Sequence, residues 1–298
     1  MWLRLLHVPL DTCEPHVVTE APIPPAQHGA VARSGTRVHF WLSGPARGPL
    51  VVLSHGATMD ARMFDLQVPA LTAAGYRALV WDSRGHGASR PLGTSPITVA
   101  DMADDLLAVL DHLGEPGPVH HVGQSLGTYV GQRILLDHPG RVASLAVIGG
   151  TSLTLPLPAW QRWSLAASRT ALRVWPERHL RRLMARSTAV DPAAQRYALK
   201  AGDQMSWKDF LAVWDAVTRA LEPRADYRIE HPLLLLVGER DRTGTVAREA
   251  PRWAAREPRC RYELVPGAGH NANQDQPGIV NRLLLEFLTE QDGDPTTT

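Results

Sequence analysis

The chain has 298 residues, of which 44% are hydrophobic and 20% charged, and its formal net charge at pH 7 is +1. This composition is typical of a globular protein, and the charge provides no bulk attraction to nucleic acid or to an anionic membrane. Cys13 and Cys260 are too few for a disulfide framework, no metal-ligand spacing is visible, and no stretch approaches an uncharged membrane span. The first 15 residues make a poor signal peptide, so we expect a cytoplasmic protein.

The chain begins with an expected arm and a hairpin. Residues 1–28 include the segment APIPPAQHG, which favours neither helix nor strand, so they are predicted to form an irregular N-terminal arm. The segment AVARSGTRVHFWL (30–42) is typical of a hairpin that turns at Ser34 and Gly35. PLVVLSHG (49–56) and YRALVWD (76–82) indicate buried strands, and helical spacing separates them.

The clearest predicted helix covers residues 98–113. Thr98 and Asp101 form a capping box, apolar residues recur on one face as far as Leu113, and Gly114 ends the helix. The strand PVHHVG (118–123), a helix through Leu136 and the strand RVASLAVIG (141–149) follow. Strands that alternate with helices at this spacing predict a parallel sheet joined by helical crossovers.

The alternation stops between residues 151 and 228, where stretches rich in Trp, Leu, Ala and Arg are helical and no strand is convincing. It resumes with PLLLLVGERD (232–241), a helix near 245–256, the strand YELVPGAGH (262–270) and a helix near 277–290. The sequence therefore predicts an α/β core at 29–150 and 229–290, a helical cap at 151–228, and a flexible tail at 291–298.

Polar side chains follow three of the predicted parallel strands. Ser125 comes after VHHVG, Asp241 after LLLLVGER, and His270 after YELVPGAG. Functional groups in parallel sheets gather where strands end and helices begin, so we expect these three side chains to meet.

Five motifs share one family pattern. They are SHGATMD, WDSRGHGAS, GQSLG, the Gly-x-x-Asp of VGERD, and GAGH. In this order and spacing the chain resembles an α/β-hydrolase with a cap domain, over roughly residues 30–290. The resemblance implies a mostly parallel, eight-stranded sheet flanked by helices, with a helical cap insertion. It also implies a catalytic triad in the chain order Ser, Asp, His.

Each position of the implied site has a chemical role. Ser125 is the expected nucleophile in a strained turn, His270 the base that takes its proton, and Asp241 the acid that orients the imidazole. The backbone N–H groups of Ala57 and Leu126 are the expected oxyanion donors. No cofactor or metal is expected.

Other residues compete for these roles. Glu239 lies near Asp241, but the alternative position for the acid, after Ile148, reads GGTS and has no carboxylate, which favours Asp241. His55 and His86 belong to family motifs of their own, and His120 and His121 lie within a strand. Asp82 and Arg84 are expected to hold their own loop together.

The insertion contains six aromatic residues that could line an apolar acyl pocket: Trp160, Trp163, Trp175, Trp207, Phe210 and Trp214. We expect most of them to form the core of the cap, with at least one facing Ser125. The arginine-rich run from Arg162 to Arg186 is expected to be a solvated helical face rather than an anion site.

A serine nucleophile favours acyl chemistry. Relatives that open epoxides or cleave carbon–halogen bonds carry aspartate there, because water later attacks the ester carbonyl of the intermediate. We therefore expect a serine hydrolase that cleaves a carboxylic ester, lactone or thioester of a small, largely apolar molecule. C–C bond hydrolysis, peracid formation, acyl transfer, and a small-molecule receptor that retains the pocket stay open as alternatives. Neither nucleic acid nor a membrane is an expected partner, and the sequence leaves the oligomeric state open.

Overall fold

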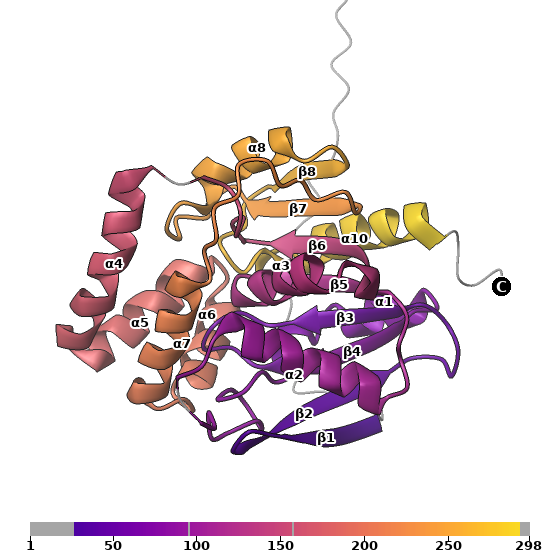
Figure 1. Cartoon of the computed structure of the whole chain (residues 1–298), viewed down its shortest axis with the longest axis horizontal. Helices are drawn as coiled ribbons and strands as arrows, with labels where there is room; N and C mark the ends of the chain where they lie inside the picture. The colour runs from indigo at the N-terminus through magenta and orange to yellow at the C-terminus, as the bar shows by residue number, and fades with distance from the viewer. Residues whose placement is uncertain (1–26, 95, 157, 293–298) are drawn as a thin grey trace, which may run out of the picture.

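The computed structural model describes residues 27–94, 96–156 and 158–292. Eight strands form one sheet in the order β1-β2-β4-β3-β5-β6-β7-β8 (Figure 1). They are β1 (Gln27–Arg33), β2 (Thr36–Ser43), β3 (Leu50–Ser54), β4 (Arg77–Trp81), β5 (Val119–Gln124), β6 (Val142–Ile148), β7 (Leu233–Gly238) and β8 (Cys260–Val265). Strand β2 is antiparallel to β1 and β4, and the other neighbouring pairs are parallel. The predicted mostly parallel sheet is confirmed.

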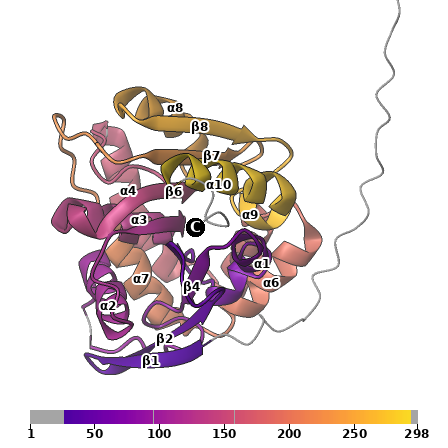
Figure 2. The same ribbon diagram turned by 90° about the vertical axis from the view of Figure 1, so that its right-hand side faces the viewer.

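Helices cover both faces of this sheet (Figure 2). One face carries α2 (Val99–His112), α3 (Leu126–Asp137) and α8 (Val246–Arg256). The other carries α1 (Val68–Ala73), α9 (Ala272–Asp275) and α10 (Pro277–Asp292). Short 3-10 helices at Ala61–Phe64 and Pro139–Arg141 complete the core.

The central strands are apolar throughout because both of their faces are buried. In β7, Leu233 and Leu235 pack on the side of α2 and α3, and Leu234 and Leu236 pack on the side of α1 and α10. Such a strand reads as a continuous apolar run rather than as an alternation. The central strands could therefore be predicted from their continuous apolar runs.

The predicted capping box of α2 is confirmed. Thr98 Oγ1 accepts a hydrogen bond from Asp101 N at 3.1 Å, and Asp101 Oδ2 accepts one from Thr98 N at 2.7 Å. Gly114, which follows the helix, has φ +73°, a conformation that glycine adopts without strain.

The helical insertion, residues 151–228, contributes four helices and no strand within its described residues. They are α4 (Ala159–Val174), α5 (Glu177–Thr188), α6 (Pro192–Gly202) and α7 (Trp207–Arg219). The four helices gather at one end of the sheet, at the left of Figure 1. The Tyr197 hydroxyl donates to Asp60 and accepts from its backbone N–H, and Asp275 accepts from Val190 N at 2.9 Å. These contacts join the insertion to the core.

Three predicted boundaries were wrong. Strand β1 already includes Gln27 and His28, inside the predicted arm, because these residues pair with Leu42 and Trp41 of β2. Strand β8 begins at Cys260 rather than at Tyr262 because Cys260 already pairs with Leu233 of β7. Helix α10 continues to Asp292, inside the predicted tail, and Asp292 Oδ2 lies 2.7 Å from His120 Nε2. The remainder of the arm and of the tail lies outside the described residues.

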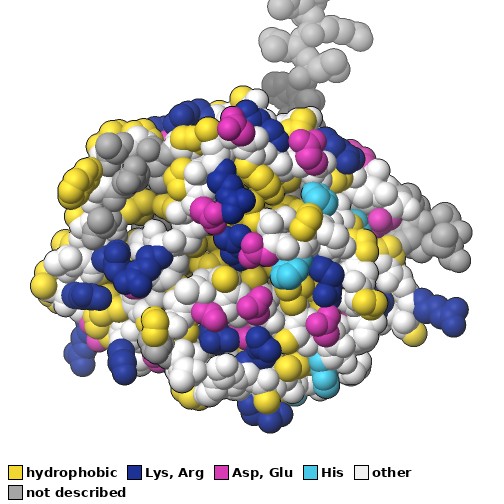
Figure 3. Space-filling view, viewed as in Figure 1, with side chains coloured by type: hydrophobic (Ala, Val, Ile, Leu, Met, Phe, Trp, Pro, Cys, Tyr) yellow, Lys and Arg dark blue, Asp and Glu magenta, His cyan; other side chains and the backbone are white. Residues whose placement is uncertain are grey.

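No helix among the described residues is long and apolar enough to cross a membrane. The expected cytoplasmic location stays a prediction. On the face shown in Figure 3, basic and acidic side chains are interspersed over the core, and basic side chains gather over the insertion at the left. Arg178, Arg182 and Arg186 of α5 are exposed, as expected for a solvated helical face.

Candidate active site

Ser125 occupies a sharp turn between β5 and α3. Its backbone has φ +48° and ψ −109°, a strained conformation for a residue with a side chain. The turn is possible because strand and helix approach each other closely at two glycines. A Cβ atom at Gly127 would lie 1.9 Å from Ser54 O, and one at Gly123 would lie 2.5 Å from Gly127 C.

His270 and Asp241 meet at the ends of the neighbouring strands β8 and β7. His270 Nδ1 lies 2.9 Å from Asp241 Oδ2, and both residues are buried. Asp241 Oδ1 accepts a hydrogen bond from Thr243 N at 2.8 Å, so both carboxylate oxygens have partners. The competing Glu239 is exposed and accepts instead from Gly267 N. Of these two carboxylates, Asp241 is the one that can orient the imidazole.

Ser125 and His270 border the same cavity. Among the side-chain hydrogen bonds of the described residues, His270 has one with Asp241 and none with Ser125. Contacts of this kind are often long without substrate and tighten when substrate binds. A continuous series of hydrogen bonds from Ser125 through His270 to Asp241 therefore requires Ser125 Oγ and the His270 imidazole to come into contact when substrate binds.

Two residues that the sequence did not single out lie between the His270 loop and the serine turn: Gln124 bonds to the loop, and Gly149 leaves room for it. Gln124 Nε2 lies 3.2 Å from His270 O and 3.3 Å from Asn271 Oδ1. Gly149 has φ +59°, and a Cβ there would lie 2.7 Å from His270 O. The position of Gln124, directly before Ser125, was the signal that could have identified it.

The two predicted oxyanion donors border the cavity next to Ser125. Leu126 is the first residue of α3, where a backbone N–H has no partner within its own helix. Ala57 lies in a tight turn in which Met59 N donates to Gly56 O and Thr58 has φ +65°. His55 Nδ1 is 2.8 Å from Gly56 O, and Ser83 N donates to His55 Nε2 at 3.0 Å. His55 therefore joins the Ala57 turn to the next loop.

Asp82 and Arg84 were expected to hold their own loop together, but among the described residues only the Asp82–Ala88 side-chain contact lies within that loop, and their other side-chain contacts join it to neighbouring elements. Asp82 accepts from the backbone N–H groups of Ala61 and Ala88, each at 2.7 Å. Arg84 donates twice to the buried Asp105 of α2. Burial lowers the pKa of His86 and of His121 to about 3, so both imidazoles are neutral. His121 Nε2 lies 2.7 Å from Ser54 Oγ, and His120 Nδ1 lies 2.8 Å from Ser144 Oγ.

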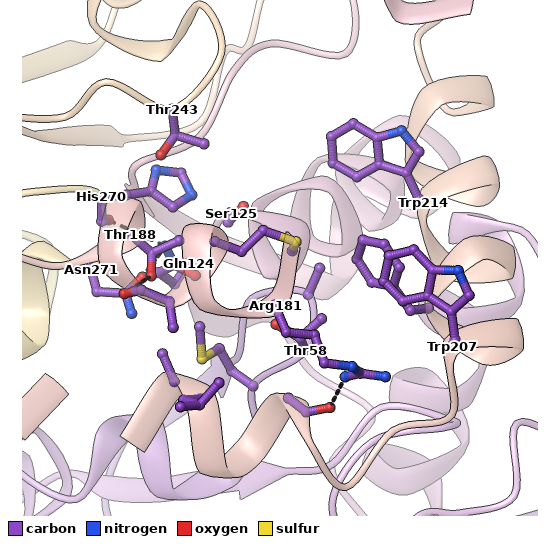
Figure 4. A pocket seen from close by; sticks show the side chains of 18 residues that line it. Thr58, Gln124, Ser125, Arg181, Thr188, Trp207, Trp214, Thr243, His270 and Asn271 are labelled. Atoms are coloured by element: carbon purple, nitrogen blue, oxygen red, sulfur yellow. Dashed lines mark hydrogen bonds between the residues drawn. The ribbon is translucent and has the colours of Figure 1, made fainter. Parts of the chain in front are cut away.

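The cavity beside Ser125 has two lobes that share five lining residues: Ala57, Ser125, Trp214, Thr243 and His270. The smaller one, the α6 lobe, has a volume of about 100 Å³ and is enclosed mainly by α5, α6 and α7 (Figure 4). The larger one, the α8 lobe, has a volume of about 350 Å³. Residues 149–155 and helices α3, α4, α7 and α8 enclose it.

The aromatic residues of the insertion divide into two groups. Trp207, Phe210 and Trp214 of α7 border the α6 lobe together with Ser125, so the expectation that at least one faces the nucleophile is confirmed (Figure 4). The expectation that most would form the core of the insertion was wrong, because Trp160, Trp163 and Trp175 are 57%, 76% and 51% exposed. They lie on the outward side of α4 and at its end, whereas Gln161, Leu165 and Ser168 line the cavity.

The sheet order, the strained serine turn and the neighbouring His270–Asp241 pair define an α/β-hydrolase. The model of the Hydrolase_4 family, serine aminopeptidase S33, matches residues 45–277, and the chain belongs to this family. It is therefore a hydrolase of the α/β-hydrolase fold.

Known proteins of several named activities resemble the chain. A Variovorax paradoxus protein named "Putative carbamate hydrolase RutD" is 39% identical over 39% of this chain, and the match spans only 43% of that protein's length. Epoxide hydrolase A of Mycobacterium tuberculosis is 26% identical over 87% of this chain and 96% of its own length. The crystal structure of a Pseudomonas aeruginosa hydrolase has a TM-score of 0.74 at 26% identity, covering 88% of this chain and 98% of that one.

Proposed function

We propose that the protein is a serine hydrolase that cleaves a carboxylic ester of a small, largely apolar molecule through an acyl-enzyme intermediate. The observation that carries this proposal is the buried His270–Asp241 pair, 2.9 Å apart, at the same cavity as the strained Ser125. A serine hydroxyl is a weak nucleophile unless an oriented base removes its proton. Asp241 supplies that orientation, because it holds Nδ1 and leaves Nε2 for Ser125.

The reaction proceeds in two halves. In the first, His270 Nε2 takes the Ser125 proton while Ser125 Oγ attacks the ester carbonyl, and the backbone N–H groups of Ala57 and Leu126 stabilise the oxyanion. The imidazolium then protonates the leaving alcohol. In the second half, His270 removes a proton from water, which attacks the acyl-enzyme. The imidazolium then returns its proton to Ser125 Oγ as the bond from Oγ to the acyl carbon breaks, and the acid is released.

The residue type at position 125 separates this chemistry from epoxide opening. One relative is named an epoxide hydrolase, but opening an epoxide with Ser125 would leave a serine ether. An ether has no carbonyl for water to attack, so the enzyme would stay alkylated. Ser125 therefore favours substrates with an acyl group.

The walls of the cavity support an apolar substrate. In the α6 lobe they include Met184, Ala198 and Phe210, and in the α8 lobe Leu165 and Val217. Because the two lobes meet at Ser125, one lobe can hold the acyl chain of the ester while the other holds its alcohol part. The insertion would then act as a cap that keeps bulk water from the acyl-enzyme.

A substrate panel tests the proposal. Purified protein is assayed with p-nitrophenyl esters from acetate to octanoate, lactones, a thioester, an aryl carbamate and a 1,3-diketone, with the Ser125→Ala variant as control. We expect multiple turnovers of esters that Ser125→Ala lacks. The carbamate is included because of the relative named for that activity. Cleavage of the diketone alone, or a single slow turnover with ligand-dependent binding of another protein, would overturn the ester assignment.

A further inference from the structure

One aromatic side chain of the insertion lies where the two lobes of the cavity meet. Five residues line both lobes, and four of them belong to the core: Ala57, Ser125, Thr243 and His270. The fifth, Trp214 of α7, is the only described residue of the insertion that lines both. Its indole lies across the cavity from Ser125 and His270 (Figure 4). A bulky group thus stands at the boundary between the lobes, and the proposed triad does not use it.

The indole of Trp214 is held by a second helix of the insertion. Trp214 Nε1 donates a hydrogen bond to Ser168 Oγ of α4 at 3.1 Å, and Ser168 Oγ donates in turn to Leu165 O at 2.7 Å. Turning the ring into either lobe would break the bond at Nε1. The ring therefore limits both lobes at the point where they join.

The two lobes differ in size. The α6 lobe has a volume of about 100 Å³ and the α8 lobe of about 350 Å³. Both lobes reach Ser125, so an ester whose carbonyl carbon lies at Ser125 Oγ extends one chain into each lobe. A long chain fits the α8 lobe, and only a short chain fits the α6 lobe.

The charged side chains in the walls already have partners. In the α6 lobe, Arg181 Nε donates to Glu177 Oε1 at 2.9 Å. In the α8 lobe, Arg252 NH1 lies 2.9 Å from Glu249 Oε2. A paired charge has no need of a counter-charge from the substrate, and burying a new charge beside it would be costly. Both lobes therefore favour uncharged chains.

Most neutral polar side chains of the walls also have partners within the protein. In the α8 lobe, Tyr129 bonds to Thr151 at 2.6 Å, and other side chains bond to backbone or side-chain groups: Ser152, Gln161, Ser164, Ser168 and Thr218. In the α6 lobe the same holds for three more: Gln124, Thr188 and Asn271.

A few polar groups of the walls have no hydrogen bond among the described residues. They are the hydroxyl groups of Thr58, Thr243 and Thr245, the indole N–H of Trp207, and Gln161 Oε1, of which Thr243 Oγ1 and Gln161 Oε1 are buried. The rest of the α8 lobe is apolar, with Leu155, Leu165, Val217, Leu221 and Val246 in its wall. An alkyl chain can pack there without taking partners from bonded polar groups.

We propose that Trp214 is a specificity residue that makes the enzyme select esters with one short and one long alkyl chain. This inference rests on the proposed esterase function and names its substrate class. The oxyanion donors fix the carbonyl oxygen, and the leaving oxygen must face His270, so one assignment of the acyl and alcohol parts to the lobes is productive. A chain too long for the α6 lobe would collide with the indole of Trp214.

Isomeric esters test the proposal. Ethyl octanoate, butyl hexanoate, pentyl pentanoate, hexyl butanoate and octyl acetate have the same number of carbon atoms and differ in where the ester group divides the chain. We expect kcat/KM for the better of the two end members, ethyl octanoate and octyl acetate, to exceed that for pentyl pentanoate by at least about tenfold. A single methylene that a pocket cannot hold already costs about tenfold. Which end member is better shows which lobe holds the acyl chain.

Variants assign the preference to Trp214. In Trp214→Ala the two lobes should join, and the ratio of the better end member to pentyl pentanoate should fall below about threefold. Differences in the intrinsic reactivity of the esters cancel in this comparison with the wild-type protein. Trp163→Ala is the matched control, because Trp163 is 76% exposed on α4 and lines neither lobe. Its ratio should stay at about tenfold or more.

The outcomes separate this proposal from the esterase function. If the wild-type protein cleaves pentyl pentanoate as well as the better end member, the selection is overturned and the esterase function stands. An unchanged ratio in folded Trp214→Ala, or an equal fall in Trp163→Ala, would overturn the role of Trp214. If Trp214→Ala does not fold, Trp214→Phe, with its smaller ring, should lower the ratio at least about threefold, and an unchanged ratio there would overturn the role as well. Turnover of none of the esters would overturn the esterase function, and this inference with it.

Discussion

His270 Nδ1 lies 2.9 Å from Asp241 Oδ2, although 29 positions separate the two residues along the chain. They meet because β7 and β8 are parallel neighbours, so the loops that follow them leave the sheet at the same edge. Thr243 N holds the other oxygen of Asp241 at 2.8 Å. The carboxylate is thus fixed before substrate arrives, and the imidazole with it.

This geometry predicts that Asp241→Asn lowers kcat/KM for esters by roughly 10³–10⁴-fold. The carboxamide keeps the shape of the side chain but cannot stabilise the imidazolium that forms during attack. Steady-state kinetics on the best ester of the panel measures the loss. The matched control is Glu239→Gln, which changes an exposed carboxylate two positions away. It should lose less than about twofold, and equal losses in the two variants would contradict the assignment.

The close approach of β5 and α3 predicts a steric effect at Gly127. A Cβ there would lie 1.9 Å from Ser54 O, so Gly127→Ala should lower the free energy of unfolding by roughly 1–3 kcal/mol and displace Ser125. Gly278→Ala is the control, since nothing lies within 4 Å of its added Cβ, and it should be neutral or stabilising by up to about 1 kcal/mol. Urea denaturation of both variants makes the comparison. Equal free energies of unfolding in Gly127→Ala and Gly278→Ala would show that the turn at Ser125 does not need glycine at position 127.

Much of this fold could be predicted because its signals are local. The central strands are buried on both faces and so read as apolar runs, and the Thr98–Asp101 box marks the start of α2. The start of β1 and the end of α10 were placed less well because contacts with other elements define them. Gln27 and His28 extend β1 by pairing with Leu42 and Trp41 of β2, and the Asp292–His120 contact accompanies the last turn of α10.

Arg84 should act on stability rather than on the reaction. Its guanidinium is buried and bonds to Asp105, which is wholly buried and also accepts from Arg33. Asp105→Ala would leave Arg84 buried without a counter-charge, and we expect a loss of about 3–5 kcal/mol in the free energy of unfolding. Chemical denaturation measures it. A loss below about 1 kcal/mol would mean that water reaches Arg84 and replaces the carboxylate.

Stability should fall in mild acid because of buried neutral histidines. Burial lowers the pKa of His121 to about 3, below its ordinary value of 6.5. Between these two pH values, the imidazole is protonated in the unfolded chain and neutral in the folded chain. This contribution is fully present above pH 6.5 and is lost as the pH falls towards 3. From pH 7 to pH 5 the loss is about 2 kcal/mol for such a histidine.

The variant His121→Gln should therefore reduce the drop in unfolding free energy between pH 7 and pH 5 by about 2 kcal/mol. Urea titrations at the two pH values give the difference, and His138→Gln, at an exposed histidine, is the control. An unchanged drop in His121→Gln would show that this imidazole is not the group responsible. His86 should contribute in the same direction, since burial lowers its pKa to about 3 as well.

The candidate site was predictable to the extent that its motifs are short and carry their own geometry. GQSLG places a serine between two glycines, and Asp241 and His270 each follow a recognisable strand. The walls of the cavity were not predictable, because they depend on how α4 and α7 are turned. Gln161 faces inward and Trp160, its neighbour, is 57% exposed, a difference that composition alone does not reveal.

The central claim is that Ser125 is an activated nucleophile whose base is His270. Labelling the folded protein with a fluorophosphonate and mapping the modified peptide tests it most directly. We predict a single covalent adduct on Ser125, absent in Ser125→Ala and lost in His270→Ala. An adduct on another residue, or undiminished labelling of Ser125 in the His270→Ala variant, would contradict the account.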